Sequence, residues 1–217
     1  MDGVLTQLQD SHNLKANEWV LSGLRRLPPR SKVLDFASGS GRHALAALAL
    51  GMQVEAWDND PVALEALAQS APQQVRCVVC DLELQPWPAG ARKFDAVVVT
   101  NYLFRPRLAL LAELLNEGGV LIYQTFATGH EALGRPRRPD FLLRPGELFQ
   151  AALGMGLHVV SYEDSVNVDA VSHAPPIAQN EVRRLPSSRV QRLLALNAPQ
   201  GEASPEALSA WPVNIQG

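Results

Sequence analysis

The sequence predicts an α/β fold built on a doubly wound, mostly parallel sheet with helices on both faces. Short apolar runs alternate along the chain with segments of helical periodicity, as in repeated βαβ units. A glycine-rich turn at 37–41 joins the first strand to a helix, and acids stand at the ends of three successive strands, at Asp35, Asp58 and Asp81. Ligands of such sheets bind at the carboxyl ends of the strands, where these acids are expected to meet.

The segment 32–60, KVLDFASGSGRHALAALALGMQVEAWDND, predicts a strand, a turn, a helix and a second strand. The first strand is the apolar run from Lys32 to Phe36, and the small residues after it let the backbone turn without side-chain clashes. Apolar residues then recur at helical spacing until Gly51, a residue that commonly ends a helix. The apolar run at 53–57 is the second strand and ends in Asp58.

The rest of the chain continues the alternation. We expect further helices at 17–27, 61–68, 108–115 and 145–155, and further strands at 75–79, 94–100, 120–126, 157–162 and 190–196. The segment 127–144 predicts a long loop rich in glycine, proline and arginine, a kind of loop that is usually functional or disordered. The segment 163–188 fits no element.

Composition limits the class of protein. With 217 residues, 47% of them hydrophobic, we expect a single domain over 1–217, in which 1–15 and about 197–217 are tails. The formal net charge of −3 argues against general affinity for nucleic acid or membrane surfaces. No signal pattern and no run of 18 apolar residues occurs, so the protein is expected to be cytoplasmic. Cys77 and Cys80 point to opposite faces of a strand, so no metal site is expected there.

The glycine turn differs from the dinucleotide fingerprint G-x-G-x-x-G. Its glycines are Gly39 and Gly41, and the acid Asp35 stands at the end of the strand. An acid there repels a pyrophosphate but suits the cationic amino-acid end of S-adenosylmethionine. Asp58 follows 23 residues later, which fits one strand, one helix and one strand, and it can accept hydrogen bonds from the hydroxyls of a ribose. An NAD-dependent oxidoreductase is therefore disfavoured.

At this point the chain resembles a known family. VLDFASGSGRHA is similar to the first motif of class I S-adenosylmethionine-dependent methyltransferases, D-x-G-x-G-x-G, with Ala37 in place of the first glycine. WDND, CDLE, FDAVVVTNYLFRP and LNEGGVLIYQTF resemble the later motifs in the same order. The resemblance covers roughly 18–163 and is nearest to small bacterial single-domain members of the tellurite-resistance and thiopurine-methyltransferase kind. It implies a seven-stranded Rossmann-like sheet that ends in an antiparallel strand.

The resemblance implies a donor site in which Asp58 binds the ribose, Asn59 lies against the adenine, and Asp81 and the Leu82 amide contact the adenine edge. Arg42 would hold the donor's carboxylate, and His43 would be a positioning residue; a surface histidine and a solvated turn aspartate are the alternatives for His43 and Asp81. The complete expected donor set is Asp35, Ala37, Ser38, Gly39, Gly41, Arg42, His43, Asp58, Asn59, Asp81, Leu82 and Thr100. The cofactor is S-adenosylmethionine, with S-adenosylhomocysteine as product and no metal.

The acceptor side is less defined. Asn101 and Tyr102 occupy the position of the family's catalytic motif, although a capping role for Asn101 is an equal alternative. His130, Arg135 and Arg138 lie in the loop expected over the acceptor, where they either grip an anionic substrate or are simply solvated. Tyr123 and Gln124 are further acceptor-side candidates for which a structural role is favoured.

The sequence thus predicts a methyltransferase that uses S-adenosylmethionine, and three alternatives for what it does with the methyl group. A small-molecule acceptor is favoured because no RNA-binding module and no overall basic charge is present. An RNA or protein acceptor, contacted by the arginine-rich loop 134–144, is the second reading. A binding domain without turnover is the third.

Overall fold

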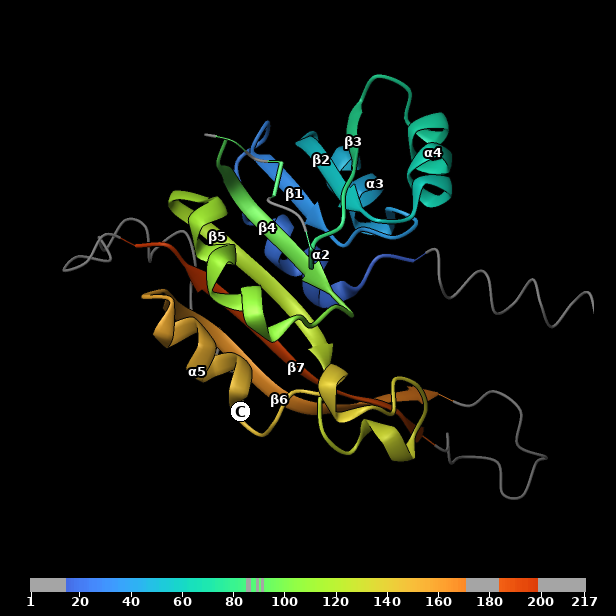
Figure 1. Cartoon of the computed structure of the whole chain (residues 1–217), viewed down its shortest axis with the longest axis vertical. Coiled ribbons are helices and arrows are strands. Elements are labelled where there is room, and N and C mark those ends of the chain that lie inside the picture. Colours follow the sequence, from blue (N-terminus) through green and yellow to red (C-terminus); the bar gives the residue numbers. More distant parts are fainter. Residues whose placement is uncertain (1–14, 85–86, 89, 91, 171–183, 199–217) are drawn as a thin grey trace, which may run out of the picture.

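The computed structural model describes residues 15–84, 87–88, 90, 92–170 and 184–198. Their centre is one seven-stranded sheet with strand order β3-β2-β1-β4-β5-β7-β6 (Figure 1). The strands are β1 (Lys32–Phe36), β2 (Gln53–Asp58), β3 (Val75–Val79), β4 (Phe94–Thr100), β5 (Leu115–Phe126), β6 (His158–Ala170) and β7 (Arg184–Leu196). β7 runs antiparallel to both of its neighbours, β5 and β6, and the other strand pairs of the sheet are parallel. The predicted fold class and its antiparallel last strand are confirmed.

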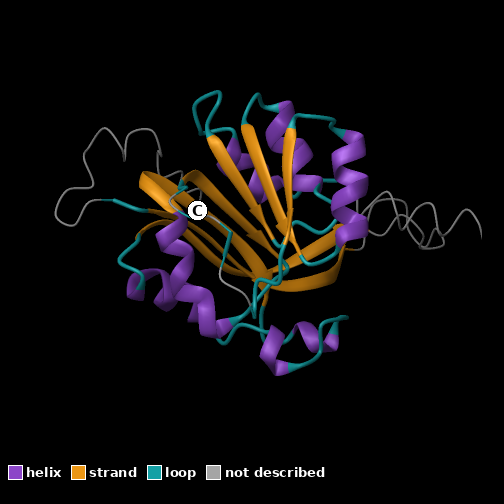
Figure 2. Ribbon diagram, turned by 45° about the horizontal axis from the view of Figure 1, so that its top comes forward, coloured by secondary structure: helices purple, strands orange, loops and turns teal. Residues whose placement is uncertain are grey.

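Helices cover both faces of the sheet (Figure 2). One face carries α2 (Glu18–Leu24), α3 (Arg42–Ala49) and α4 (Pro61–Ser70), whose buried residues form a core with Val54, Val98 and Ile122. The other face carries α5 (Glu147–Gly154) and the 3₁₀ segment η1 (Arg105–Leu114), which pack on a second core. No described helix is long and apolar enough to cross a membrane.

Two helices begin at caps that the sequence supplies. The Asn17 side chain accepts a hydrogen bond from the Trp19 amide, 2.9 Å away, and so caps α2. Asp60 does the same for α4 with the amides of Val62 and Ala63, and Pro61 stands at the first helical position, where its missing N–H is not needed. These caps fix the residues at which α2 and α4 begin.

The prediction of an α-helix at 108–115 is wrong. The segment Arg105–Leu114 forms 3₁₀ turns, and β5 begins directly after it at Leu115 rather than at 120. The buried residues of the segment are Leu108, Leu111 and Leu114, which are spaced by three. A 3₁₀ helix has three residues per turn, so this spacing places all three on one face toward the core.

The C-terminal hairpin is longer than expected. β6 and β7 are each 13 residues long and pair from His158↔Leu196 to Ala170↔Arg184. Much of the segment 163–188, which the sequence left unassigned, therefore extends the two strands. Residues 171–183 of that segment, and 1–14 and 199–217 of the expected tails, lie outside the described residues.

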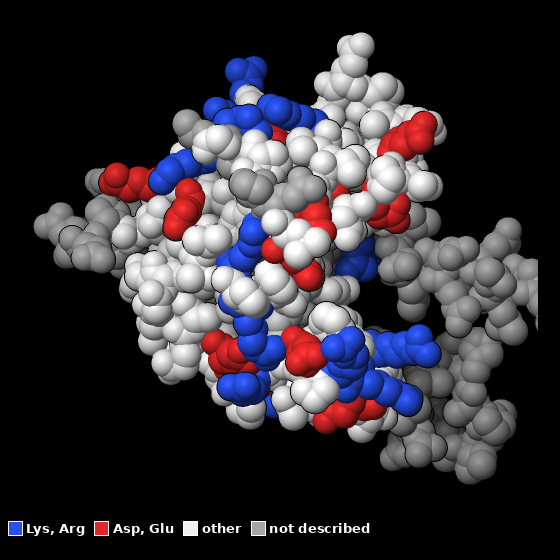
Figure 3. Space-filling view, viewed as in Figure 1, with Lys and Arg blue, Asp and Glu red and all other residues white. Residues whose placement is uncertain are grey.

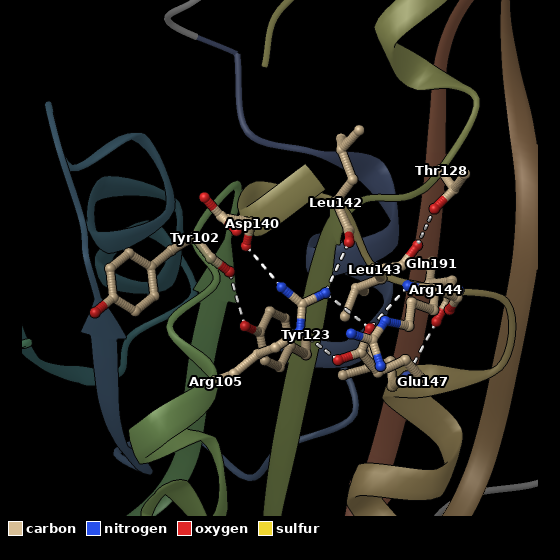
Figure 4. A network of polar contacts seen from close by, with 11 residues as sticks. Tyr102, Arg105, Tyr123, Thr128, Asp140, Leu142, Leu143, Arg144, Glu147 and Gln191 are labelled. Atoms are coloured by element: carbon tan, nitrogen blue, oxygen red, sulfur yellow. Dashed lines mark hydrogen bonds and ion pairs between the residues drawn. The ribbon is translucent and has the colours of Figure 1, made fainter. Parts of the chain in front are cut away.

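The loop 127–146 is held against the sheet by a polar network centred on Arg105 (Figure 4). The Arg105 guanidinium donates to the carbonyl oxygens of Asp140 (2.7 Å) and Leu142 (2.8 Å) and to both carboxylate oxygens of Glu147 (2.5 and 2.8 Å). The hydrogen bond from Arg105 holds the pKa of Glu147 below its ordinary value. Buried Gln191 adds a bond from its side chain to the Arg144 carbonyl, 2.7 Å away. The loop is thus tied to η1, α5 and β7.

Replacing Arg105 tests whether this network orders the loop. Arg105→Lys keeps the charge but cannot form the planar fork, so at least two of the four bonds are lost. We expect faster amide hydrogen exchange over 127–146 and a free energy of unfolding lower by roughly 1–2 kcal/mol, because the pair is only partly buried. Arg138→Lys is the matched control, since the Arg138–Asp140 pair is exposed. Equal exchange in both variants would contradict the role of Arg105.

Candidate active site

Two carboxylates hold the turn between β1 and α3. Oδ2 of Asp58, at the end of β2, accepts a hydrogen bond of 2.7 Å from the Gly39 amide. Oδ2 of Asp35, at the end of β1, accepts one of 2.9 Å from the Ala44 amide. Ala37, Gly39 and Gly41 have φ of 56°, 52° and 75°, so three residues of a five-residue turn lie in the left-handed region. The turn is compact because the two acids satisfy its amides.

Asp35 is a buried acid with one carboxylate oxygen that has no hydrogen-bond partner among the described residues. It is 1% exposed, its Oδ1 has no hydrogen-bond partner in the described protein, and burial raises its pKa to about 7. The Oγ of Ser38 is likewise buried and unpartnered. Buried polar atoms without partners are rare and costly, so both atoms point to a ligand that supplies the missing bonds. An ammonium group suits Asp35, and a carboxylate suits the Ser38 hydroxyl.

A small hollow lies at the carboxyl ends of β1, β2 and β3. Its volume is about 180 Å³, and it is lined by Ala37, Asp58, Asn59, Asp81, Leu82, Glu83 and Tyr102. We call it the small hollow. It brings together five of the residues expected in the donor set and adds Glu83. Each oxygen of Asp58 already accepts one backbone bond, from Gly39 or Asp60, and each has a further lone pair for a hydroxyl.

Asp81 also has a structural role. Its Oδ1 accepts hydrogen bonds from the amides of Glu83 and Leu84, which shapes the turn after β3. The Leu82 carbonyl accepts a bond of 3.1 Å from the Trp87 indole, and the Trp87 ring packs edge-on against Phe36. Asp81, Leu82 and Glu83 of this turn form one wall of the small hollow.

His43 connects α3 to the end of β4 and to the start of α2. Its Nε2 accepts a hydrogen bond from the Asn17 amide, so the proton is assigned to Nδ1, which faces the Thr100 hydroxyl at 3.3 Å. Burial, together with the nearby Arg42, lowers the pKa of His43 to about 3. The ring is therefore neutral at physiological pH. His43 and Thr100 hold α2 beside the glycine turn.

A large hollow of about 730 Å³ opens beside the same turn. It is lined by residues of α2, β4, β5 and the hairpin: Asn17, Glu18, Trp19, Ser22, Arg42, Asn101, Gln124, Phe126, Asn167, Ser187, Ser188, Val190 and Arg192. We call it the large hollow. Asn101 has φ of 55°, in the left-handed region that asparagine tolerates, and its amide donates to the Gln124 carbonyl at 2.9 Å. Asn101 lines the large hollow, whereas Tyr102 lines the small one, so this pair separates the two.

Arg192, which no sequence motif indicated, also lines the large hollow. Its guanidinium donates to Gln124 Oε1 (2.7 Å), to Glu163 Oε2 (2.9 Å) and to Asn167, and it lies 5.8 Å from the centre of the Trp19 ring. The signal was a single arginine within the apolar strand sequence VQRLLAL. A charged residue inside an otherwise buried strand needs partners, and these come from three different elements.

The loop residues expected on the substrate side lie elsewhere. His130 is 3% exposed and stacks on Phe126, with ring centroids 4.2 Å apart. Its Nδ1 accepts a bond from the Arg189 amide, and its Nε2 donates to the Arg135 carbonyl at 2.8 Å. Arg138 pairs with Asp140, and neither hollow is lined by any residue of 127–146. The structure therefore does not bring His130, Arg135 or Arg138 together with the glycine turn.

Comparisons with known proteins agree with this geometry. Residues 33–119 match the family described as methyltransferase domain. Among solved structures, TehB from Haemophilus influenzae aligns with a TM-score of 0.62 and 19% identity over 83% of this chain and 62% of its own. The TehB-like SAM-dependent methyltransferase from Corynebacterium glutamicum aligns at 0.59 and 19% over 89% and 96%. The [4+2]-cyclase SpnF also aligns, at 0.55 and 18% over 67% and 57%.

Residues 33–119 thus match a methyltransferase domain, and the sheet has the Rossmann-like topology of methyltransferases. The solved structures, all below 20% identity, show the shared fold alone. The present chain spans about three fifths of the TehB chain. No curated protein sequence matches the chain. The glycine turn, the acid at each strand end and the two idle buried oxygens fit the donor that the family uses.

Two glycine substitutions separate the roles of the turn. A Cβ at Gly39 would meet no atom within 4 Å, so Gly39→Ala costs only its left-handed backbone, about 1 kcal/mol, but fills space next to Asp58. A Cβ at Gly41 would clash with Cδ2 of the buried Leu67 side chain. Gly41→Ala should therefore lower the free energy of unfolding by about 2–4 kcal/mol. We expect calorimetry to show that Gly39→Ala lowers affinity for S-adenosylhomocysteine about tenfold or more. Unchanged affinity would remove Gly39 from the ligand contact.

The pKa of Asp35 predicts a pH dependence of stability. The folded protein holds the Asp35 proton up to about pH 7, whereas the unfolded chain loses it near 3.8. The free energy of unfolding should therefore fall as pH rises from about 4 to about 7. Asp35→Asn removes this dependence and should stabilise the ligand-free protein above pH 7, by at most about 4 kcal/mol. Denaturant titrations at several pH values measure this, and equal slopes for both proteins would contradict the buried acid.

Proposed function

We propose that the chain transfers a methyl group from S-adenosylmethionine to a small polar acceptor bound in the large hollow. The observation that carries the proposal is that the two hollows meet at one place. Asn101 and Tyr102 are consecutive at the end of β4, and one lines each hollow. Arg42, directly after the glycine turn, also lines the large hollow. A donor in the small hollow would thus face an acceptor in the large one.

The donor would be held at three points. The ribose hydroxyls would bind Asp58, and the adenine would lie beside Asn59, Asp81 and Leu82 in the small hollow. The amino-acid end would supply an ammonium group to Asp35 Oδ1 and a carboxylate to Ser38 Oγ or Arg42. Bound there, S-adenosylmethionine supplies an electrophilic methyl group on a sulfonium. Binding of its ammonium group would favour the ionised form of Asp35, so donor affinity should fall as pH drops below about 7.

The protein would act mainly by positioning. The acceptor atom must lie in line with the methyl–sulfur bond, attack with its lone pair and leave the sulfur as a thioether, which yields S-adenosylhomocysteine. Tyr102 stays protonated at neutral pH because burial raises its pKa well above the ordinary value, so it is not available as a general base, and Asn101 does not titrate in this range. Holding two reactants in the correct orientation supplies a large share of the rate by itself. The amide and guanidinium groups of Asn101, Gln124 and Arg192 suit an acceptor with oxygen or nitrogen functions.

The shape of the large hollow favours a small acceptor over RNA or protein. It is a recess of about 730 Å³ with polar walls, the size of a small-molecule site. The arginine-rich loop that would contact RNA uses two of its arginines for contacts within the loop, because Arg137 donates to the Gly134 carbonyl and Arg138 pairs with Asp140. Its residues line neither hollow. The loop therefore gives little support to the second reading.

Transfer of a radiolabelled methyl group tests the proposal. Purified protein is mixed with labelled S-adenosylmethionine and separate small-molecule, RNA and protein fractions of a bacterial extract. We expect label in the small-molecule fraction, and none with Asp58→Ala, which loses two hydroxyl contacts worth about 1.5–3 kcal/mol each. Arg192→Met should keep affinity for S-adenosylhomocysteine but lose transfer.

The other outcomes discriminate among the readings. Label in RNA or protein would contradict the small acceptor. Binding of both S-adenosyl compounds without any transfer would favour a domain without turnover, which is a relevant outcome because a cyclase shares this fold. Calorimetric binding of NAD instead of S-adenosylmethionine would overturn the donor assignment.

A further inference from the structure

A third hollow lies at the opposite ends of the sheet strands from the glycine turn. Its volume is about 610 Å³, and it is lined by Lys32, Gln53, Val54, Glu55, Arg76, Arg92, Lys93, Phe94 and Asn116. Four of these residues begin or nearly begin β1, β2 or β4, so the hollow is at the amino ends of the strands. We call it the basic hollow. It shares no lining residue with the small or the large hollow.

Among the described residues, no helix covers the part of the sheet beside the basic hollow. The connection between β3 and β4 contains turns but no helix among its described residues, 80–84, 87–88, 90 and 92–93. Glu55 and Trp57 alternate onto the face that such a helix would cover, beside Arg76 on β3. Two side chains of the connection itself, Arg92 and Lys93, line the hollow instead.

The hollow concentrates positive charge in an acidic protein. Lys32, Arg76, Arg92 and Lys93 all line it, although the whole chain has a formal net charge of −3. Lysine and arginine side chains gather at the top of the view in Figure 3, above the amino ends of β1 and β4 in Figure 1. Like charges placed close together repel, so such a cluster reduces stability unless a ligand neutralises it.

The local acids do not neutralise the cluster. Glu55, with 8% of its side chain exposed, accepts a hydrogen bond from the Trp57 indole (2.7 Å) and one from Arg92 Nη2 (3.2 Å), and lies 3.9 Å from Arg76 Nε. Asp95 accepts from the Lys32 amide and from the Asn116 side chain. Lys32 and Lys93 form no ion pair within the described part of the chain. Against four cations, two carboxylates leave two positive charges.

Hydrogen bonds from neighbouring groups also orient Arg92. The buried Glu55 carboxylate holds Arg92 from below, and the Pro88 carbonyl accepts a second bond from Arg92 Nη2 at 2.6 Å. The side chains of Arg92 and Arg76 are still 40% and 59% exposed, so their remaining N–H groups are open to a ligand. Guanidinium groups fixed in this way match the oxygens of a phosphate.

We infer that the basic hollow binds a small ligand that carries two or more phosphate groups, such as a nucleoside polyphosphate. Two uncompensated positive charges, the oriented Arg92 guanidinium, the exposed Arg76 guanidinium and the Asn116 amide suit such an anion, and the volume suits a ligand of nucleotide size. The hollow is a recess with a limited charge excess on an acidic chain, which favours a small anion over a long nucleic acid.

Calorimetric titration with inorganic tripolyphosphate tests this inference, because that probe has the charge but no adenine that could enter the small hollow. We expect binding that weakens when salt is raised from about 50 to about 200 mM. Saturation of the protein with S-adenosylhomocysteine should leave this binding unchanged. The double variant Lys32→Gln and Lys93→Gln, which breaks no ion pair of the described chain, should lower affinity about tenfold or more. Arg25→Gln, on the exposed Arg25–Glu18 pair, is the control and should change affinity less than about twofold.

Four outcomes would overturn the inference. They are no binding of tripolyphosphate at low salt, equal affinity of the double variant and the wild-type protein, loss of binding when S-adenosylhomocysteine is present, and binding of a single-stranded RNA oligonucleotide without binding of tripolyphosphate. None of these outcomes bears on the proposed methyl transfer, because the assay contains no methyl donor or acceptor.

Discussion

The site depends on one constraint, the pair of carboxylates that hold the turn after β1. Asp58 accepts an amide hydrogen bond from Gly39 in this turn, and Asp35 accepts one from Ala44 in the first turn of α3. The turn can therefore adopt left-handed backbone at Ala37, Gly39 and Gly41 and still leave its surface open to a ligand. The cost is a buried acid with one unpartnered oxygen, which destabilises the ligand-free protein once Asp35 ionises. Such a cost is reasonable where a ligand supplies the missing bond.

The candidate donor residues could be chosen from the sequence because local chemistry determines their arrangement. Asp35, Gly39, Gly41 and Asp58 belong to one βαβ unit, and in such a unit strand length and turn composition decide which side chains meet. The family resemblance extended this to Asn59, Asp81 and Leu82, which line the small hollow together with Asp58. Strands 75–79 and 94–100 were also predicted at their observed bounds. For 94–100 the reason is that a mostly apolar run is typical of a parallel strand buried on both faces.

The lining of the large hollow could not be predicted from the sequence because its residues meet only through long-range packing. Trp19, Asn101, Gln124, Asn167 and Arg192 come from five separate elements, and no local pattern announces their contact. His130 and the loop arginines looked functional by composition, yet tertiary contacts occupy both nitrogens of His130 and tie the loop to Arg105. The expected helix at 108–115 failed because apolar residues spaced by three fit 3₁₀ turns as well as an α-helix. The basic hollow was missed for a related reason: Lys32, Arg76 and Arg92 lie far apart in sequence and meet only in the sheet.

The most direct test of the central claim is a crystal structure of the protein with S-adenosylhomocysteine. Our account predicts the ribose hydroxyls within hydrogen-bond distance of Asp58, the amino group against Asp35 Oδ1, and the sulfur between Asn101 and Tyr102, facing the large hollow. A ligand that binds away from the glycine turn, or that leaves Asp35 Oδ1 without a partner, would contradict the account.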